Sequence, residues 1–162
     1  MLKPLNQAAE RRSTQGPGHS VDARRASHRG NAPGVRVLII DDDASALECF
    51  EQMLIDDGHE VRAVRTVEAG LAEAAIGAPD VILLDFHMPV MDGLECLRHL
   101  RKEPLNLQVP VALLTGDYFL DDDVIRELQA LGARIYFKPV WDTDLHQILE
   151  ALVSPSRRAN AQ

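Results

Sequence analysis

The chain has 162 residues and carries 17 Lys and Arg against 25 Asp and Glu, a formal net charge of −8. That length is enough for one domain with a proper hydrophobic core. The acidic balance disfavours non-specific binding to nucleic acid, because phosphate groups would be repelled. No apolar run approaches the ~18 residues that span a bilayer, and the N-terminus has no apolar signal region. We therefore expect a cytoplasmic protein without membrane contact.

The first 33 residues have a composition of their own. They contain six basic and two acidic side chains, a net charge of +4, so the remainder of the chain carries −12. Gly, Pro and polar residues are frequent here. Because such a composition buries too little apolar surface to offset the entropy of ordering, we predict a disordered basic N-terminal arm over 1–33. We predict one folded domain over 34–153 and a disordered tail over 154–162.

The two cysteines and the six histidines show no metal-ligand pattern. Cys49 and Cys96 lie far apart in segments with helical periodicity and form no Cys-x-x-C motif. We expect both to be reduced thiols. The spacing of the histidines predicts no zinc site.

From Gly34 onward, segments with the pattern of strands alternate with segments with the pattern of helices. Strands are predicted where β-branched and apolar residues cluster, at 35–40, 60–64, 81–84, 109–114 and 134–137. Helices are predicted from their apolar periodicity and their Gly or Pro ends, at about 44–57, 67–76, 93–102, 121–131 and 142–153. Asp142 or Thr143 is the expected cap of the last helix. This alternation with short links predicts a doubly wound α/β layer, a five-stranded parallel sheet with helices on both faces.

The third predicted strand runs directly into a carboxylate. The four apolar residues before Asp85 suit a strand that is buried on both faces of a parallel sheet. The carboxyl end of such a strand is where open α/β folds place their sites. Because Pro89 and an Asp-Gly turn separate Asp85 from the next helix, we predict that Asp85 is a reactive group and not a helix cap. Asp43, by contrast, is expected to cap the helix that follows it.

The other strand ends bring more polar groups to the same edge. The first strand ends in Asp41 and Asp42, the fourth in Thr115 and the fifth in Lys138. Neighbouring carboxylates raise each other's pKa, which a divalent cation and a lysine relieve. A set of carboxylate and carbonyl oxygens suits Mg²⁺. The pattern predicts phosphoryl transfer onto Asp85 as nucleophile, with Mg²⁺ and Lys138 neutralising the phosphoryl oxygens.

These motifs, in this order, resemble those of a known family. The acidic pair after the first strand, the D-x-x-M-P-x-M-D-G run that begins at Asp85, Thr115 and Lys138-Pro139 are similar to the receiver domain of bacterial two-component response regulators. The resemblance extends from about Val35 to Val153. It implies the (βα)5 flavodoxin-like receiver fold and a role in a two-component phosphorelay.

The resemblance also implies a role for each residue near the metal. Asp85 accepts the phosphoryl group from a histidine kinase or a histidine phosphotransfer protein. Asp42 binds Mg²⁺ directly and Asp41 binds it through water. The backbone carbonyl of His87 completes the metal shell. The choice of Asp41 and Asp42 over Asp43 follows the family pattern, because spacing alone does not decide it.

On the phosphate side, the resemblance implies that Thr115 moves to bond the phosphoryl group and that Lys138 forms an ion pair with it. Pro139 is expected to follow a cis peptide bond. At the fifth strand, Ile135 stands where the family commonly has an aromatic switch residue, and Tyr136 lies beside it. Whether Ile135 or Tyr136 replaces that switch is open.

The expected output is a protein interaction. The few residues after Val153 leave no room for a DNA-binding or catalytic output domain, so we expect a stand-alone receiver without direct nucleic-acid binding. We expect no enzyme activity beyond self-phosphorylation from a donor and autodephosphorylation. Signalling would pass to a downstream protein, or through a homodimer that uses the face of the fourth helix, the fifth strand and the last helix.

Two other functions are compatible with parts of this pattern. A pseudo-receiver would use the same fold as a constitutive protein-binding module; the altered fifth strand favours it, and the complete set of site residues disfavours it. A phosphohydrolase with an aspartyl nucleophile would need a second carboxylate two residues after Asp85. His87 occupies that position, so this activity is disfavoured.

Overall fold

The computed structural model describes residues 34–159, with side chains described as far as Val153. The predicted basic arm over 1–33 lies outside the described residues, as do residues 160–162 of the predicted tail. Among the described residues, no helix is long and apolar enough to cross a membrane.

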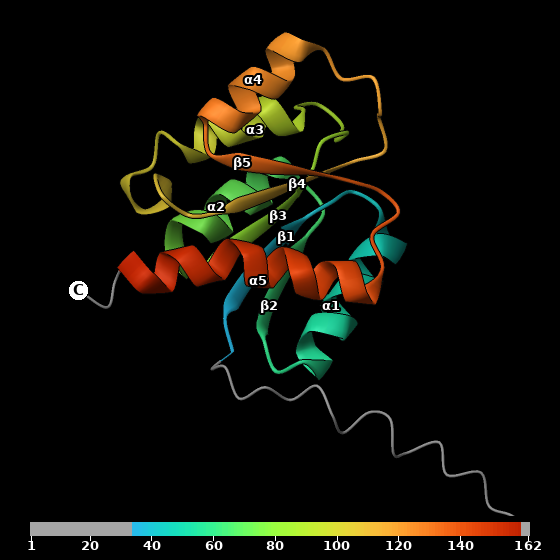
Figure 1. The fold of residues 1–162 in the computed structure, drawn as a ribbon, viewed down its shortest axis with the longest axis vertical. Coiled ribbons are helices and arrows are strands. Elements are labelled where there is room, and N and C mark those ends of the chain that lie inside the picture. The colour runs from blue at the N-terminus through green and yellow to red at the C-terminus, as the bar shows by residue number, and fades with distance from the viewer. Residues whose placement is uncertain (1–33, 160–162) are drawn as a thin grey trace, which may run out of the picture. The chain divides into compact units, whose positions relative to one another are not determined.

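Within residues 34–159, one parallel sheet forms the middle layer of the fold (Figure 1). Its strands lie in the order β2-β1-β3-β4-β5, and each neighbouring pair is parallel. Their bounds are β1 (Arg36–Ile40), β2 (Glu60–Val64), β3 (Val81–Asp85), β4 (Val111–Thr115) and β5 (Ala133–Phe137). The predicted five-stranded, doubly wound sheet is confirmed.

Helices cover both faces of this sheet. Their bounds are α1 (Ala44–Asp56), α2 (Val67–Gly77), α3 (Gly93–Leu100), α4 (Asp122–Ala130) and α5 (Asp142–Ala159), with a short 3-10 helix, η1 (Pro104–Asn106), before β4. Successive strand residues point to opposite faces. Leu84 therefore packs in the apolar layer under α2, α3 and α4, and Leu83 packs in the layer under α1 and α5. Every residue of β3 is buried, as its apolar run predicts.

β4 begins two residues later than predicted. The predicted start, Val109, and the next residue, Pro110, precede the strand. Proline has no N–H with which to donate to a sheet ladder. The two carbonyl groups still have partners, because the Val109 oxygen accepts from Arg101 Nη2 at 3.0 Å and the Pro110 oxygen accepts from the Ile82 N–H at 3.0 Å.

The last helix departs from prediction at both ends. The residue before its first turn is Trp141, and not Asp142 or Thr143 as predicted. The Trp141 N–H donates to Asp144 Oδ2 at 3.0 Å, so a carboxylate three residues later in the chain accepts from the backbone N–H that precedes the helix.

At its other end, α5 continues to Ala159 and does not stop near Val153, so residues 154–159 are helical and not a disordered tail. Position 155 is a proline, which cannot donate to the carbonyl of Ala151 four residues earlier. Arg134 Nη1 on β5 donates to that carbonyl at 3.0 Å. A tertiary hydrogen bond therefore compensates for the missing helical one.

Candidate functional site

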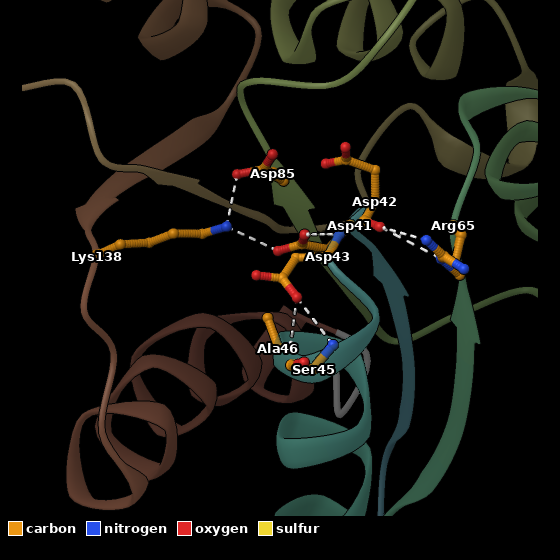
Figure 2. Close-up of polar contacts among 8 residues, drawn as sticks. All are labelled: Asp41, Asp42, Asp43, Ser45, Ala46, Arg65, Asp85 and Lys138. Carbon is orange, nitrogen blue, oxygen red and sulfur yellow. Dashed lines mark hydrogen bonds and ion pairs between the residues drawn. The ribbon is translucent and has the colours of Figure 1, made fainter.

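The predicted site residues meet at the carboxyl edge of the sheet. Asp85 is the last residue of β3, and Thr115 is the last residue of β4. Asp41 and Asp42 follow β1, and Lys138 follows β5. Because β1 and β4 both pair with β3, the parallel register places these ends side by side. Figure 2 shows Lys138 reaching from the β5 side toward Asp41 and Asp85.

Lys138 bridges two of the three carboxylates. Its Nζ lies 2.8 Å from Asp41 Oδ2 and 2.8 Å from Asp85 Oδ1 (Figure 2). Asp41 and Asp85 are buried, and Lys138 is only partly exposed to solvent. One carboxylate oxygen from each of Asp41, Asp42 and Asp85 lies within 4.8 Å of the other two. The site therefore contains three neighbouring carboxylates and one ammonium group, which pairs with two of them.

This arrangement shifts the protonation of both partners. Burial is the largest cause of a raised pKa at Asp85; the hydrogen bond and charge of Lys138 lower it, and the charges of Asp41 and Asp42 raise it further. At Lys138 burial lowers the pKa, but the hydrogen bonds to Asp41 and Asp85 and the charges of these two carboxylates together outweigh burial and raise it. The site thus holds a firmly protonated ammonium beside a carboxylate that is costly to ionise.

The loop after β1 separates the roles of its three acids. Asp43 is the N-cap of α1, and its Oδ1 accepts from the Ser45 N–H at 2.8 Å and the Ala46 N–H at 3.3 Å (Figure 2). The Asp43 N–H donates to Asp41 Oδ1 at 2.9 Å, which fixes the inward carboxylate. The predicted cap at Asp43 is confirmed. Asp41 and Asp42, and not Asp43, join Asp85 in the acidic cluster.

Arg65 supports this loop and was not predicted. Its Nε and Nη2 donate to the Asp42 carbonyl at 3.3 Å and 3.0 Å (Figure 2). Arg65 directly follows β2, the edge strand beside β1. The strand order, once known, would have placed it near the site; its position in the sequence alone would not.

The loop after β3 depends on a glycine. The Gly93 N–H donates to the Phe86 carbonyl at 2.8 Å, and a Cβ at position 93 would lie 2.9 Å from the Asp85 carbonyl oxygen. Any side chain there would displace the backbone of Asp85.

Other residues of this loop are exposed. His87 is exposed, with its ring edge-on to Phe86. Val90 is 95% exposed and has a left-handed φ of 73°.

Thr115 is buried at the end of β4, and its Oγ1 accepts from the Asp117 N–H at 3.0 Å. The hydroxyl therefore also organises the loop that leads to α4.

Of the two candidate switch residues, Ile135 packs in the layer under α2, α3 and α4, whereas Tyr136 packs in the layer under α1 and α5. The Lys138-Pro139 peptide bond is cis, as predicted.

The structure also joins residues that sequence spacing did not connect. His146 Nδ1 on α5 lies 3.1 Å from Asp57 Oδ2, just beyond the end of α1. Asp142 completes this second group of possible ligand atoms. The contact ties the end of α1 to the start of α5.

Comparison with known sequences identifies relatives. The response regulator receiver domain family matches residues 37–150. The chain is 34% identical over 119 residues to the response regulator PleD of Caulobacter vibrioides, a match that covers 72% of this chain and 26% of PleD. It is 32% identical over 120 residues to protein PilH of Pseudomonas aeruginosa, covering 74% of this chain and 98% of PilH. The chain therefore spans about a quarter of PleD and nearly all of PilH.

Solved structures show the same fold. The receiver domain of the sensor histidine kinase PA1611 of Pseudomonas aeruginosa, which has a magnesium ion coordinated in its active-site cleft, aligns with a TM-score of 0.66 at 28% identity, covering 75% of this chain and 98% of that chain. The chemotaxis protein CheY4 of Vibrio cholerae aligns with a TM-score of 0.68 at 29% identity, covering 74% of this chain and 98% of that chain.

Proposed function

Because this chain belongs to the receiver domain family of two-component response regulators, we propose that it is a phosphoacceptor whose Asp85 is phosphorylated by a histidine kinase or a histidine phosphotransfer protein. The observation that carries the proposal is the placement of the Asp85 carboxylate, which lies within 4.8 Å of two further carboxylates and 2.8 Å from the Lys138 ammonium. In this setting the buried carboxylate supplies a nucleophilic oxygen, and the neighbouring ammonium can neutralise the negative charge of the incoming phosphoryl group.

The transfer forms a bond between an Asp85 carboxylate oxygen and phosphorus. It breaks the phosphorus–nitrogen bond to the donor histidine, whose nitrogen keeps the electron pair. Lys138, held beside Asp85 Oδ1, pairs with a phosphoryl oxygen. The Thr115 hydroxyl at the next strand end bonds another phosphoryl oxygen.

The described residues suit Mg²⁺. The donor atoms of Asp41, Asp42 and Asp85 are all hard oxygens, and one from each residue lies within 4.8 Å of the other two, as the ligands of a hydrated divalent cation would. With the backbone carbonyl of His87, they would hold the ion, with Asp42 as a direct ligand and Asp41 acting through water. When bound, Mg²⁺ supplies neutralisation of the phosphoryl charge.

We propose that the phosphoryl group shifts an existing equilibrium between two conformations. Thr115 connects the site to the loop before α4, through the hydrogen bond from the Asp117 N–H. Lys138 connects it to β5 and, through the residues that follow, to α5. The face of α4, β5 and α5 would then change its affinity for a downstream protein or for a second copy of the chain. The protein itself would turn over no small substrate beyond slow loss of its own phosphoryl group.

Intact mass spectrometry after incubation with Mg²⁺ and a small acyl phosphate tests the proposal. Wild type should gain one phosphoryl adduct and Asp85→Asn none. Asp42→Asn, or omission of Mg²⁺, should slow adduct formation by about tenfold or more.

Asp43→Asn is the matched control for Asp42→Asn. Asparagine caps a helix as well as aspartate does, and Asp43 lies outside the acidic cluster. It should react at nearly the wild-type rate. An equal adduct on Asp85→Asn would refute the acceptor role, and failure of wild type to react would favour a constitutive binding module.

A further inference from the structure

Four of the chain's aromatic side chains are solvent-exposed at the edge that carries Asp85, on the last residue of β5 and on the loops that follow β4 and β5. Tyr118 and Phe119 follow β4, Phe137 ends β5, and Trp141 precedes α5; they are 62%, 92%, 46% and 67% exposed. Both loops run along the same side of the sheet (Figure 1). The whole chain has seven Phe, Tyr and Trp residues, so most of its aromatic surface lies here and not in the core. We call these four residues the aromatic edge. Exposed apolar patches of this kind mark interaction sites.

The aromatic edge is held in place by specific contacts. The Tyr118 ring stacks on Phe137 at a centroid distance of 4.8 Å and an interplanar angle of 9°. The Tyr118 hydroxyl donates to the Lys138 carbonyl at 2.9 Å. The Phe119 N–H donates to Asp117 Oδ1 at 2.8 Å, and the Trp141 N–H is bonded to Asp144. The stacking and the hydroxyl bond order the Tyr118 and Phe137 rings before any partner arrives, whereas the bonds at Phe119 and Trp141 fix only the backbone that carries these rings. This partial ordering lowers the entropy cost of binding.

The surroundings of the aromatic edge are acidic. The segments 117–123 and 137–144 contain six carboxylates: Asp117, Asp121, Asp122, Asp123, Asp142 and Asp144. Lys138 is the basic residue in these segments, and its ammonium is paired with Asp41 and Asp85. Arg126 on α4 pairs with Asp123, which offsets one of the six charges. The six carboxylates flank the aromatic residues along both segments, and we call them the acidic rim.

We propose that the aromatic edge binds a basic segment of a partner protein, with apolar residues flanked by Arg or Lys. Arginine side chains stack on aromatic rings and pair with carboxylates, so one residue type can contact both the aromatic edge and the acidic rim. An anionic membrane, a nucleic acid or a second copy of this acidic chain would be repelled by the same rim. The inference rests on the proposed function, because it names the partner chemistry of the output face. Binding itself does not require phosphorylation of Asp85.

A pair of peptides tests the charge preference. The probe is a fluorescein-labelled amphipathic peptide of Leu and Arg at helical spacing, and its twin has Glu in place of Arg. Anisotropy should show binding of the Arg peptide that weakens as salt rises, and no binding of the Glu peptide. Trp141 is the chain's only tryptophan, so an unlabelled Arg peptide should also change the tryptophan emission.

Variants locate the binding surface. Phe119→Ser combined with Trp141→Ser should weaken binding of the Arg peptide by about tenfold or more, since exposed aromatic anchors dominate such interfaces. Ile76→Ser is the matched control, because Ile76 is 80% exposed on α2 and lies away from both loops. It should bind like wild type.

Three results would overturn the inference: equal binding of the Glu peptide, wild-type affinity in the double variant, or an equal loss in Ile76→Ser. Self-association of the protein that Phe119→Ser abolishes would also contradict it, by making a second copy the occupant. Asp85→Asn should still bind the Arg peptide. A failed phosphorylation assay with intact peptide binding would therefore refute only the proposed function.

Discussion

Ionisation of Asp85 is less favourable in the folded protein than in the unfolded chain. Burial is the main reason that its pKa is raised, and the charges of Asp41 and Asp42 add to it, while Lys138 opposes the shift. A carboxylate that pairs with only one shared ammonium remains a strong attractor for a divalent cation and a reactive nucleophile. At this residue, the requirements of the chemistry and of stability conflict.

Replacing Asp85 by Asn should therefore stabilise the protein at neutral pH without Mg²⁺, by on the order of 1 kcal/mol. An acid with a raised folded pKa makes the fold less stable as pH rises from the ordinary value of 3.8 to the raised value, because the unfolded chain ionises first. The gain should thus be smallest below pH 3.8 and grow through that interval. Urea unfolding at several pH values measures it, with Glu48→Gln as an exposed control. A variant that is less stable than wild type at pH 7 would contradict this reading.

Val90 is a second residue whose local conformation is unfavourable. A β-branched side chain in the left-handed region costs roughly 1–2 kcal/mol, and this one gains no burial in return. Val90→Gly should raise the free energy of unfolding by about 1 kcal/mol. Val90→Ala, which keeps the Cβ, should gain clearly less. Chemical denaturation compares the three proteins, and equal stabilities would show that position 90 carries no strain.

At the scale of elements, α5 is continuous because β5 supplies a hydrogen bond that the helix lacks. Arg134 Nη1 donates to the Ala151 carbonyl, whose helical donor would be residue 155, a proline. The contact also links the helix to the edge strand of the sheet. Loss of this hydrogen bond would leave the Ala151 carbonyl with neither a helical donor nor the substitute from Arg134.

A double-mutant cycle tests this compensation. Arg134→Met should destabilise the wild-type protein by about 1 kcal/mol. In a Pro155→Ala background the restored N–H can serve the Ala151 carbonyl, so the same change should cost clearly less. The free energies of unfolding of the four proteins give the coupling. Equal effects of Arg134→Met in both backgrounds would rule out the proposed role of Arg134.

For the whole molecule, the features that could be predicted are those that depend on the pattern of residues within one stretch of sequence. The apolar run before Asp85 predicts a fully buried strand, and parallel topology then brings Asp41, Thr115 and Lys138 to the same edge. Chain order and strand ends were therefore enough to predict the sheet and the strand ends that meet there, whereas the choice of Asp41 and Asp42 over Asp43 needed the family resemblance.

The missed features depend on contacts between distant segments. Arg65 reaches Asp42 only because β2 lies beside β1. Tyr118 stacks on Phe137 only because β4 pairs with β5. Neither contact has a signature within one stretch of sequence, and both lie beside the predicted site. The aromatic edge could not be predicted as a group for the same reason, since its members come from β5 and from the loops that follow β4 and β5.

Of the three acids that cluster at the edge of the sheet, Asp85 is the one that we propose receives the phosphoryl group. Treating the wild-type protein with Mg²⁺ and a small acyl phosphate, and then with borohydride, reduces an aspartyl phosphate to homoserine. Peptide mass spectrometry then identifies the converted position. We expect homoserine at position 85 alone. Homoserine at position 41 or 42, or none at position 85, would refute the acceptor role of Asp85.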